Sequence, residues 1–237
     1  MLPWLAPNSI EFPPISDALN DPDGLLCAGG DLSATRLMAA YRQGIFPWFN
    51  PGEPILWWSP DPRCTLVPSQ VHLSKSLRKA IRKSTFEISF DQAFSEVIKA
   101  CAAPRSYSDE TWISTPMQNA YIDLHRRGVA HSVELWQNGE LTGGLYGIAM
   151  GRLFFGESMF SRATNSSKIA FAYFAKQLQK WGYALIDCQV ENSHLTSLGA
   201  CCIPRVEFQQ YLEQNRDATL SHTWQFDIDK QDVVSTQ

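Results

Sequence analysis

The strongest constraint on the fold is a hairpin signal in the middle of the chain. Asn138 and Gly139 stand between two apolar runs of alternating character, residues 133–137 and 140–150. Both residues accept the positive φ angles of a type I′ turn, so the pair marks a β-hairpin. Gly151 and Arg152 mark a second tight connection, to a strand over 153–162. The sequence therefore predicts a three-stranded antiparallel meander.

A helix and a further strand follow this meander. Residues 165–182 begin with the capping residues Asn165 or Ser166, end at a glycine, and carry an apolar stripe of Ala170, Phe174, Leu178 and Trp181. Residues 183–190 read as a short strand. A strand–helix–strand crossover of this kind is right-handed and leaves its two strands parallel and adjacent or nearly so. Glu157 is then expected close to Asp187 and Gln189.

Residues 1–62 are set apart by their prolines, which number ten of the fourteen in the chain. Prolines at this density exclude long regular elements, and one helix fits, capped by Asp31 or Ser33 and ended by Gly44. Trp48 and two further tryptophans at 57–58 form either a small aromatic core or a platform for a nucleotide base. We expect a small N-terminal domain over 1–62 and a second domain over 63–237.

A basic helix is predicted directly after this boundary. Ser74 caps a run in which cations recur at helical spacing, while apolar residues point the other way; the cations are Lys75, Arg78, Lys79, Arg82 and Lys83. Two interpretations remain open, a solvated helix face and a surface for phosphates. Further helices are predicted over 91–103, ending before Pro104, and over 114–128, with a loop containing Trp112 between them.

Composition limits the classes of function. The chain has 237 residues, 44% of them hydrophobic, and a net charge of −4, which argues against coating nucleic acid or membrane non-specifically. Its six cysteines show no C-x-x-C pair and no zinc spacing, so reduced thiols in a cytoplasm are expected. We expect no signal peptide, no membrane span and no metal. No histidine has a nucleophile at a recognisable spacing.

Asp187 and Gln189 are two residues apart on a predicted strand, so we expect their side chains on the same face. A carboxylate and an amide beside apolar positions need partners. In the structural interpretation, Asp187 caps a turn or pairs with a cation such as Arg162. In the functional interpretation, the pair binds an amine and directs its lone pair toward a carbonyl.

A meander, a crossover helix and a further strand also describe the GNAT acyltransferase fold, which the predicted order of elements resembles. GNAT enzymes that use coenzyme A normally carry a glycine-rich pyrophosphate loop at the strand-to-helix turn. Residues 161–168 contain no glycine. Because a pyrophosphate needs close approach of the backbone, coenzyme A is not predicted here.

Four blocks of sequence resemble the motifs of the leucyl/phenylalanyl-tRNA-protein transferase family, over residues 29–49, 55–63, 143–162 and 185–200. The resemblance extends over nearly the whole chain, to about Thr223. It implies a bacterial cytoplasmic enzyme of the N-end rule pathway, which moves leucine or phenylalanine from aminoacyl-tRNA to an N-terminal Arg or Lys. It also implies an α+β fold, with a small proline-rich domain preceding a GNAT-like acyltransferase domain of mixed sheet and flanking helices, without metal or coenzyme A.

The resemblance also implies roles for individual residues. Asp187 and Gln189 match the pair implicated in peptide-bond formation, and Glu157 matches an acidic residue beside them. Trp48 and Trp112 correspond to aromatics that hold the 3′-terminal adenosine. The basic helix against the tRNA acceptor arm is matched by charge pattern at Arg78, Lys79, Arg82 and Lys83.

These roles predict a mechanism without a covalent enzyme intermediate, because an aminoacyl ester is already activated. Asp187 receives or positions the amine, Gln189 fixes its geometry, and Glu157 recognises the cationic acceptor residue. The donor side chain occupies an apolar pocket of Met150, Phe154 and Met159. Since one methylene is worth only ~1–3 kcal/mol, methionine is a plausible further donor. We expect a monomer. The alternatives are a coenzyme A-dependent N-acetyltransferase and a non-catalytic tRNA-binding module.

Overall fold

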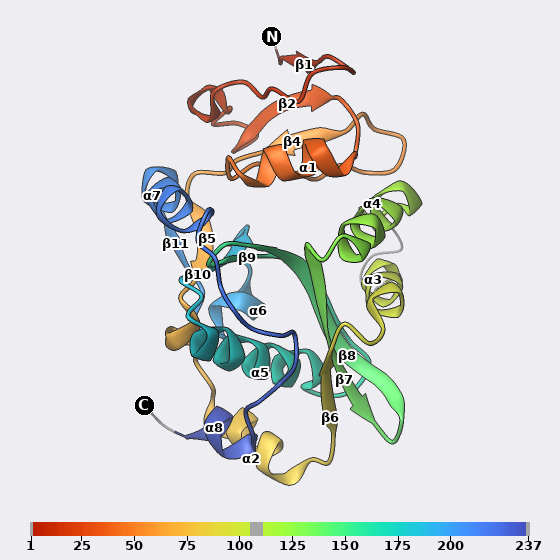
Figure 1. Ribbon diagram of the computed structural model, residues 1–237, viewed down its shortest axis with the longest axis vertical. Coiled ribbons are helices and arrows are strands. Elements are labelled where there is room, and N and C mark those ends of the chain that lie inside the picture. The colour runs from red at the N-terminus through yellow and green to blue at the C-terminus, as the bar shows by residue number, and fades with distance from the viewer. Residues whose placement is uncertain (1, 105–110, 236–237) are drawn as a thin grey trace.

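The computed structural model describes residues 2–104 and 111–235, which form two sheets and the helices that cover them (Figure 1). The smaller sheet has the order β1-β2-β4-β3 and is made by residues near the N-terminus. Its strands are β1 (Trp4–Leu5), β2 (Leu25–Gly29), β3 (Phe46–Pro47) and β4 (Leu56–Trp58). The predicted helix is α1 (Ala34–Tyr41), and a short 3-10 turn (Ile15–Asp17) precedes β2. The smaller sheet is therefore built from the proline-rich segment.

The larger sheet has seven strands in the order β11-β5-β10-β9-β8-β7-β6. They are β5 (Arg63–Leu66), β6 (Glu87–Phe90), β7 (Ala130–Gln137), β8 (Glu140–Met150), β9 (Leu153–Ser161), β10 (Leu185–Gln189) and β11 (Cys201–Ile203). Neighbours are antiparallel except β9 and β10, which are parallel. Asn138 and Gly139 have φ angles of 52° and 78°. The meander, its turn and the parallel crossover are thus confirmed.

The helices after α1 are α2 (Lys75–Lys83), α3 (Phe94–Ala102), α4 (Thr115–Arg126), α5 (Ser166–Trp181), α6 (Ser193–Thr196), α7 (Arg205–Asn215) and α8 (Lys230–Val234), with a 3-10 turn at Pro68–Gln70. Three of the helices, α1, α2 and α4, begin directly after the serine caps predicted for them. The hydroxyls of Ser33, Ser74 and Ser114 each accept the backbone N–H three residues on. Asn165 precedes α5 at a left-handed φ of 65° without a side-chain cap bond. Part of the predicted loop around Trp112, residues 105–110, lies outside the described residues.

The larger sheet is covered on both faces (Figure 1). Successive residues of β9 show the division, because side chains alternate across a strand. Phe154 packs in a cluster with residues of α2, α5 and α8. Phe155 packs in the other cluster, with α1, α3, α4 and α7. The second cluster also contains Trp57 of the smaller sheet, so the two sheets share one core rather than the separate aromatic core considered from sequence.

The structure confirms an α+β fold with a mixed sheet flanked by helices. The chain passes from the smaller to the larger sheet between Trp58 and Arg63. Of the three clustered tryptophans, Trp57 is fully buried and donates its indole N–H to the Gly29 carbonyl at 2.9 Å, whereas Trp48 is 44% exposed. Across residues 2–104 and 111–235, no helix combines the length and apolar character needed to cross a membrane.

Candidate active site

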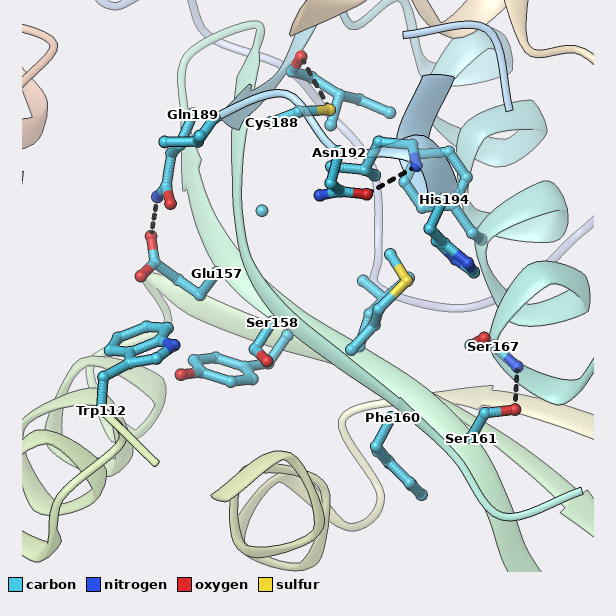
Figure 2. Close-up of a pocket in the computed structure, with 18 of the residues that line it drawn as sticks. Trp112, Glu157, Ser158, Phe160, Ser161, Ser167, Cys188, Gln189, Asn192 and His194 are labelled. Atoms are coloured by element: carbon cyan, nitrogen blue, oxygen red, sulfur yellow. Dashed lines mark hydrogen bonds between the residues drawn. The ribbon is translucent and has the colours of Figure 1, made fainter. Parts of the chain in front are cut away.

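A large cavity lies where the two parallel strands separate. The last paired residues of β9 and β10 are Phe155 and Asp187, yet β9 continues to Ser161 and β10 to Gln189. A cavity of about 1050 Å³, here called the main cavity, is lined by residues 156–162 on one side and 188–195 on the other. Figure 2 shows Gln189 reaching across it toward Glu157, with Asn192 and His194 on the opposite side. The separation of the strands thus creates the space.

Glu157 is the polar centre of the main cavity. Its carboxylate is 8% exposed and accepts three side-chain hydrogen bonds, from Tyr41 at 2.7 Å, Tyr121 at 2.9 Å and the Gln189 amide at 2.9 Å. The two tyrosine hydroxyls are themselves 2.5 Å apart. No cation among the described residues pairs with Glu157. A buried carboxylate held by neutral donors is suited to receive a cationic ligand.

Burial sets the protonation of this carboxyl. Loss of water raises the pKa of Glu157 to about 7, and the nearby Asp187 charge acts in the same direction. The hydrogen bonds from Tyr41, Tyr121 and Gln189 lower the pKa and offset part of that rise. Burial and the Glu157 charge also raise the pKa of both tyrosines well above the ordinary value, so they remain hydroxyl donors at neutral pH. Glu157 therefore changes charge near neutrality.

Asp187 has a different partner. Its two oxygens accept from the Arg63 guanidinium at 2.8 and 2.6 Å, a bidentate pair in which both side chains are nearly fully buried. The guanidinium lies between the rings of Phe46 and Phe208, each centroid 4.7 Å away. The cation is thus Arg63 and not Arg162, whose guanidinium lies over Phe160. Asp187 is absent from the described lining of the main cavity.

Asp187 and Gln189 diverge despite their spacing of two. The pairing of β10 with β5 shifts register between them, and Gln189 has a φ of 63°. Such a bulge breaks the strict alternation of side chains, which is why the same-face expectation is wrong. One Asp187 oxygen accepts the Gln189 backbone N–H at 2.9 Å. The carboxylate therefore fixes the backbone from which the Gln189 amide reaches Glu157, and the expected proximity of the three residues is confirmed.

Aromatic and apolar side chains form the rest of the wall. Trp48 and Trp112 both line the main cavity, and Trp112 lies beside Glu157 (Figure 2). Phe154 and Met159 also line it, together with Leu145, Phe171, Phe174 and Ile186. Met150 is not among the residues that line it; its side chain is 5% exposed and belongs to the hydrophobic cluster that contains residues of α3 and α4. Its expected place in the donor pocket is therefore dropped.

The basic helix α2 lies apart from this wall and packs against α5 and α8 through the buried side chains of Leu77 and Ile81. Lys79, Arg82 and Lys83 are exposed and Arg78 is half-buried. Among the described residues, none of the helix's five cations forms an ion pair. The amphipathic pattern read from sequence is confirmed, and it leaves an unneutralised positive surface.

Three residues of this site were not singled out from sequence: Arg63, Tyr41 and Tyr121. Tyr41 and Arg63 lie within the blocks that carry the family resemblance, which is the one signal that marked their neighbourhoods. Tyr121 had no signal beyond its place on a predicted helix. Within the described ranges, which include all six cysteines, no disulfide bond is formed, and no group of three acidic, histidine or cysteine side chains is arranged to hold a metal ion.

The fold and site together define a class. The protein is an α+β protein with a cavity between separated parallel strands. The buried Glu157 carboxylate, which forms no ion pair with a described residue, lies in this cavity together with apolar side chains. This arrangement suits a transferase that holds an apolar donor beside a cationic acceptor.

Comparison with known proteins identifies the family. The family model described as "Leucyl/phenylalanyl-tRNA protein transferase" matches residues 65–213, and the model of its N-terminal domain matches residues 30–61. A leucyl/phenylalanyl-tRNA–protein transferase of Pseudomonas syringae pv. syringae is 59% identical over 224 residues, covering 94% of this chain and 98% of the relative. One of Pseudomonas paraeruginosa is 58% identical, covering 95% and 100%. The chain belongs to the leucyl/phenylalanyl-tRNA–protein transferase family and is a tRNA-dependent aminoacyltransferase.

Solved structures overlap more loosely. A GCN5-related N-acetyltransferase from Kribbella flavida is 10% identical at a TM-score of 0.37, covering 71% of this chain and 59% of that one. The L-PGS from Bacillus licheniformis is 12% identical at a TM-score of 0.38, covering 70% and 53%. Likeness at this level defines no activity, and the family assignment rests on the sequence relatives alone.

Proposed function

We propose that the protein transfers leucine or phenylalanine, and less efficiently methionine, from aminoacyl-tRNA to the N-terminal Arg or Lys of proteins, marking them for N-end rule degradation. The observation that carries the proposal is the Glu157 carboxylate, buried without a cation of its own among the described residues and bonded to the Gln189 amide at 2.9 Å. An acceptor with a guanidinium or ammonium side chain supplies the missing charge.

The amine is positioned by Gln189. Its Nε2 donates to Glu157, and no described residue donates to its Oε1, which is left to accept from the attacking amine. Both Asp187 oxygens already accept from Arg63 or the Gln189 backbone. We therefore assign Asp187 a positioning role through Gln189, in place of direct contact with the amine.

The reaction is aminolysis of an ester. The α-ammonium first loses a proton to the solvent, and its nitrogen then bonds to the ester carbon. The bond from that carbon to the ribose oxygen breaks, and the nitrogen loses a second proton while the leaving ribose oxygen gains one, so the products are an amide and a ribose hydroxyl. The ester is activated before it arrives, so proximity and orientation are the main demands on the protein. No described side chain needs to form a covalent intermediate.

The donor side chain occupies the apolar part of the main cavity, against Phe154 and Met159. An apolar pocket distinguishes similar side chains by only ~1–3 kcal/mol per methylene, which is why methionine is accepted as well. Trp48 and Trp112 stack with the 3′-terminal adenosine, each by an interaction on the order of 1–3 kcal/mol.

The tRNA contacts the positive surface of α2 through Arg78, Lys79, Arg82 and Lys83. Contacts with phosphates release counterions, so binding weakens as salt rises. Because the described lining of the main cavity contains no residue of α2, its cations contribute affinity and not the chemistry. We further propose a monomer acting in the bacterial cytoplasm, with one domain over 1–62 and another over 63–237.

The test supplies radiolabelled Leu-tRNA and a protein that begins with Arg. We expect label in the protein, sensitive to ribonuclease added before the reaction and absent when the protein begins with Glu. No transfer to the Arg-starting protein would contradict the proposal. Binding of acetyl-coenzyme A, measured by calorimetry as a parallel arm, would favour an N-acetyltransferase instead.

A further inference from the structure

Cysteines lie opposite one another on three adjacent strands of the larger sheet. Cys64 is on β5, which lies between β10 and β11. In the antiparallel pairing with β11, Cys64 lies opposite Cys202. In the pairing with β10 it lies opposite Gln189, and Cys188 is the extra residue at the register shift. Since a bulge sets two residues of one strand against one residue of its neighbour, Cys64 has a cysteine opposite it on both sides.

The side chains of Cys64, Cys188 and Cys202, here called the three-cysteine cluster, share one face of the sheet. Cys64 and Cys188 belong to the hydrophobic cluster that includes residues of α2, α5 and α8, and Cys202 packs against it. Arg63, the residue before Cys64, faces the opposite side, where its guanidinium packs on aromatic rings and pairs with Asp187. The three-cysteine cluster therefore lies behind the ion pair that supports the site.

Cys64 loses its proton most readily within the three-cysteine cluster. A hydrogen bond from the Cys188 thiol lowers the pKa of Cys64, burial opposes that effect, and a second hydrogen bond, from Cys202, lowers the pKa further. The contact with Cys64, followed by burial, raises the pKa of Cys188 well above its ordinary value. Burial raises the pKa of Cys202 to about 11. Because the thiolate is the nucleophilic form of cysteine, Cys64 is the reactive member.

Small molecules reach the three-cysteine cluster from two cavities. Cys188 lines the main cavity beside Gln189 (Figure 2), and Cys202 lines a second cavity of about 260 Å³ that shares part of its wall with the first. Cys64 itself is fully buried. It is covered by β11, a three-residue strand at the edge of the sheet, and short edge segments open locally more easily than core strands. A hydrogen peroxide molecule, little larger than water, fits such an opening.

Oxidation by hydrogen peroxide takes two steps. The Cys64 thiolate attacks one peroxide oxygen, the O–O bond breaks, and Cys64 becomes a sulfenic acid. The released hydroxide takes up the proton that the Cys64 thiol had lost and leaves as water. The Cys188 sulfur then attacks the Cys64 sulfur, the S–O bond breaks, and the second hydroxide leaves as water with the Cys188 proton. Two thiols are thus oxidised to one disulfide, and one peroxide is reduced to two waters.

The bulge favours Cys188 over Cys202 as the partner of Cys64. Cys202 stands in regular strand pairing with Cys64, so the backbone bonds of β5 and β11 hold it in place. Cys188 has no paired residue of its own at the register shift. The extra residue of a bulge lies outside the regular ladder and moves at lower cost. The Cys188 sulfur is therefore the one that approaches a sulfenic acid at Cys64.

The location of this bond links it to the site. Cys188 directly precedes Gln189, whose amide donates to Glu157 at 2.9 Å. A covalent bond holds two sulfur atoms closer than a hydrogen bond does, so a disulfide draws the bulge toward β5. Gln189 moves with the bulge, and its amide is displaced from Glu157. Since catalysis by proximity is sensitive to displacements of ~1 Å, transfer should be suppressed.

We propose that Cys64 and Cys188 form a peroxide-sensitive site, in which a disulfide between them switches the transferase off and its reduction switches the transferase on again. The formation of the bond is independent of the proposed function, whereas its effect on transfer rests on that function. Activity lost in peroxide should therefore return with a dithiol reductant.

The experiment treats the reduced protein with hydrogen peroxide. Non-reducing peptide mapping identifies the bond, and transfer from radiolabelled Leu-tRNA to an Arg-starting protein gives the rate. We expect a Cys64–Cys188 disulfide, a rate lower by about 10- to 100-fold, and recovery with dithiothreitol. Transfer by the reduced protein tests the proposed function, so its failure is distinguishable from failure of the inference, which the mapping decides. A Cys64–Cys202 bond, or a Cys64–Cys188 bond with an undiminished rate, would overturn the inference.

Variants locate the effect. Each is judged by the ratio of its oxidised to its reduced rate, so differences in basal activity or folding cancel. Cys64→Ser and Cys188→Ser each lack one sulfur of the bond, and both should raise the ratio to about one. The control, Cys201→Ser, removes the exposed thiol next to Cys202 on the same strand and should keep the low ratio of the wild type. A low ratio that persists in Cys64→Ser and Cys188→Ser would overturn the inference and assign the loss to oxidation elsewhere.

Discussion

The main cavity and the helix α2 carry charge in opposite ways. Glu157, which lines the main cavity, and Asp187 beside it are 8% and 2% exposed, and the carboxylate of each accepts several hydrogen bonds from the protein. On α2, Lys79, Arg82 and Lys83 are exposed and, within the described structure, unpaired. The free energy of a buried charge depends on the individual groups that bond to it. Exposed charges act together, and salt screens their combined attraction for a partner.

This difference separates selectivity from affinity. Where charges are buried, one lost partner leaves a desolvated group without compensation, so effects should be large and specific to one interaction. On an exposed face each cation adds a similar, salt-dependent increment to binding of a polyanion. The following changes test that division, from the largest expected effect to the smallest.

Arg63→Met should cause the largest loss of stability. It leaves Asp187 buried without its cation, which costs about 3–5 kcal/mol in the free energy of unfolding. Urea denaturation measures it as a lower midpoint at an unchanged slope. The control is Arg42→Met, whose partner Asp217 lies at the same 2.6 Å but with exposed side chains. It should cost far less stability, because water screens the charges of an exposed pair. Similar losses of stability in Arg63→Met and Arg42→Met would contradict the difference expected between a buried and an exposed ion pair.

Glu157→Gln should impair selection of the cationic acceptor. We expect kcat/KM for an Arg-starting peptide to fall about 30-fold, corresponding to roughly 2 kcal/mol, because the buried charge opposite the acceptor is lost. The control, Glu134→Gln, changes another buried carboxylate, which is bonded to Ser89 and Ser132 outside the main cavity. It should leave acceptor selection unaltered. An equal decrease in both variants would point to general damage.

The pH dependence of the wild type should report the same group. Because the pKa of Glu157 is raised to about 7, the carboxyl is mostly neutral below that pH and charged above it. Acceptor kcat/KM in the free enzyme should therefore rise as pH increases through about 7. In Glu157→Gln that inflection should disappear. An inflection near 7 that persists in the variant would assign it to another group, such as the amine of the peptide.

Arg82→Glu/Lys83→Glu should weaken tRNA binding by about tenfold at moderate salt and reduce the slope of log affinity against log salt by roughly 2. Turnover at saturating tRNA should change little, since these side chains lie outside the main cavity. The control, Lys99→Glu/Arg126→Glu, makes the same charge change on α3 and α4. A slope reduced equally in the control would show that net charge, and not α2, governs binding.

Ser74→Ala should have the smallest effect. The Ser74 hydroxyl accepts the Leu77 N–H at 3.1 Å, and loss of such a cap costs about 1 kcal/mol of stability. The helix remains packed through Leu77 and Ile81, so its cations stay in place. The midpoint of thermal unfolding should fall by a few degrees, while the slope of log tRNA affinity against log salt is unchanged. A decreased slope would mean that the cations of α2 contact tRNA only when the helix keeps its cap.

Much of the fold was readable because local chemistry and tertiary structure agree. The turn at Asn138 and Gly139 follows from the positive φ that both tolerate, and the caps at Ser33, Ser74 and Ser114 from unsatisfied backbone donors. The site was less readable. The sequence brought Glu157, Asp187 and Gln189 together, but it did not single out Arg63, because a partner 124 positions away leaves no local pattern.

The placement of Met150 shows a second limit. Its apolar character is equally suited to either face of a buried strand, and only the register of β8 assigns it to the core with α3 and α4. Phe154 and Met159 line the main cavity, which opens where β9 and β10 separate beyond Phe155 and Asp187. That separation is a property of strand pairing, which the sequence of one strand alone does not specify.

The sequence by itself determined the meander, the crossover helix, the basic surface of α2 and, through its family blocks, the kind of reaction. The meander turn, the helix caps and the basic face of α2 depend on residues close together in sequence, and the family blocks are read directly from the sequence. Only the tertiary structure showed that Asp187 pairs with Arg63 and that the Gln189 amide donates to Glu157. It also showed that a smaller cavity of about 260 Å³ adjoins the main cavity. The reason is physical: a bulge changes side-chain direction without changing composition, and the partners of buried charges come from strands and helices distant in sequence.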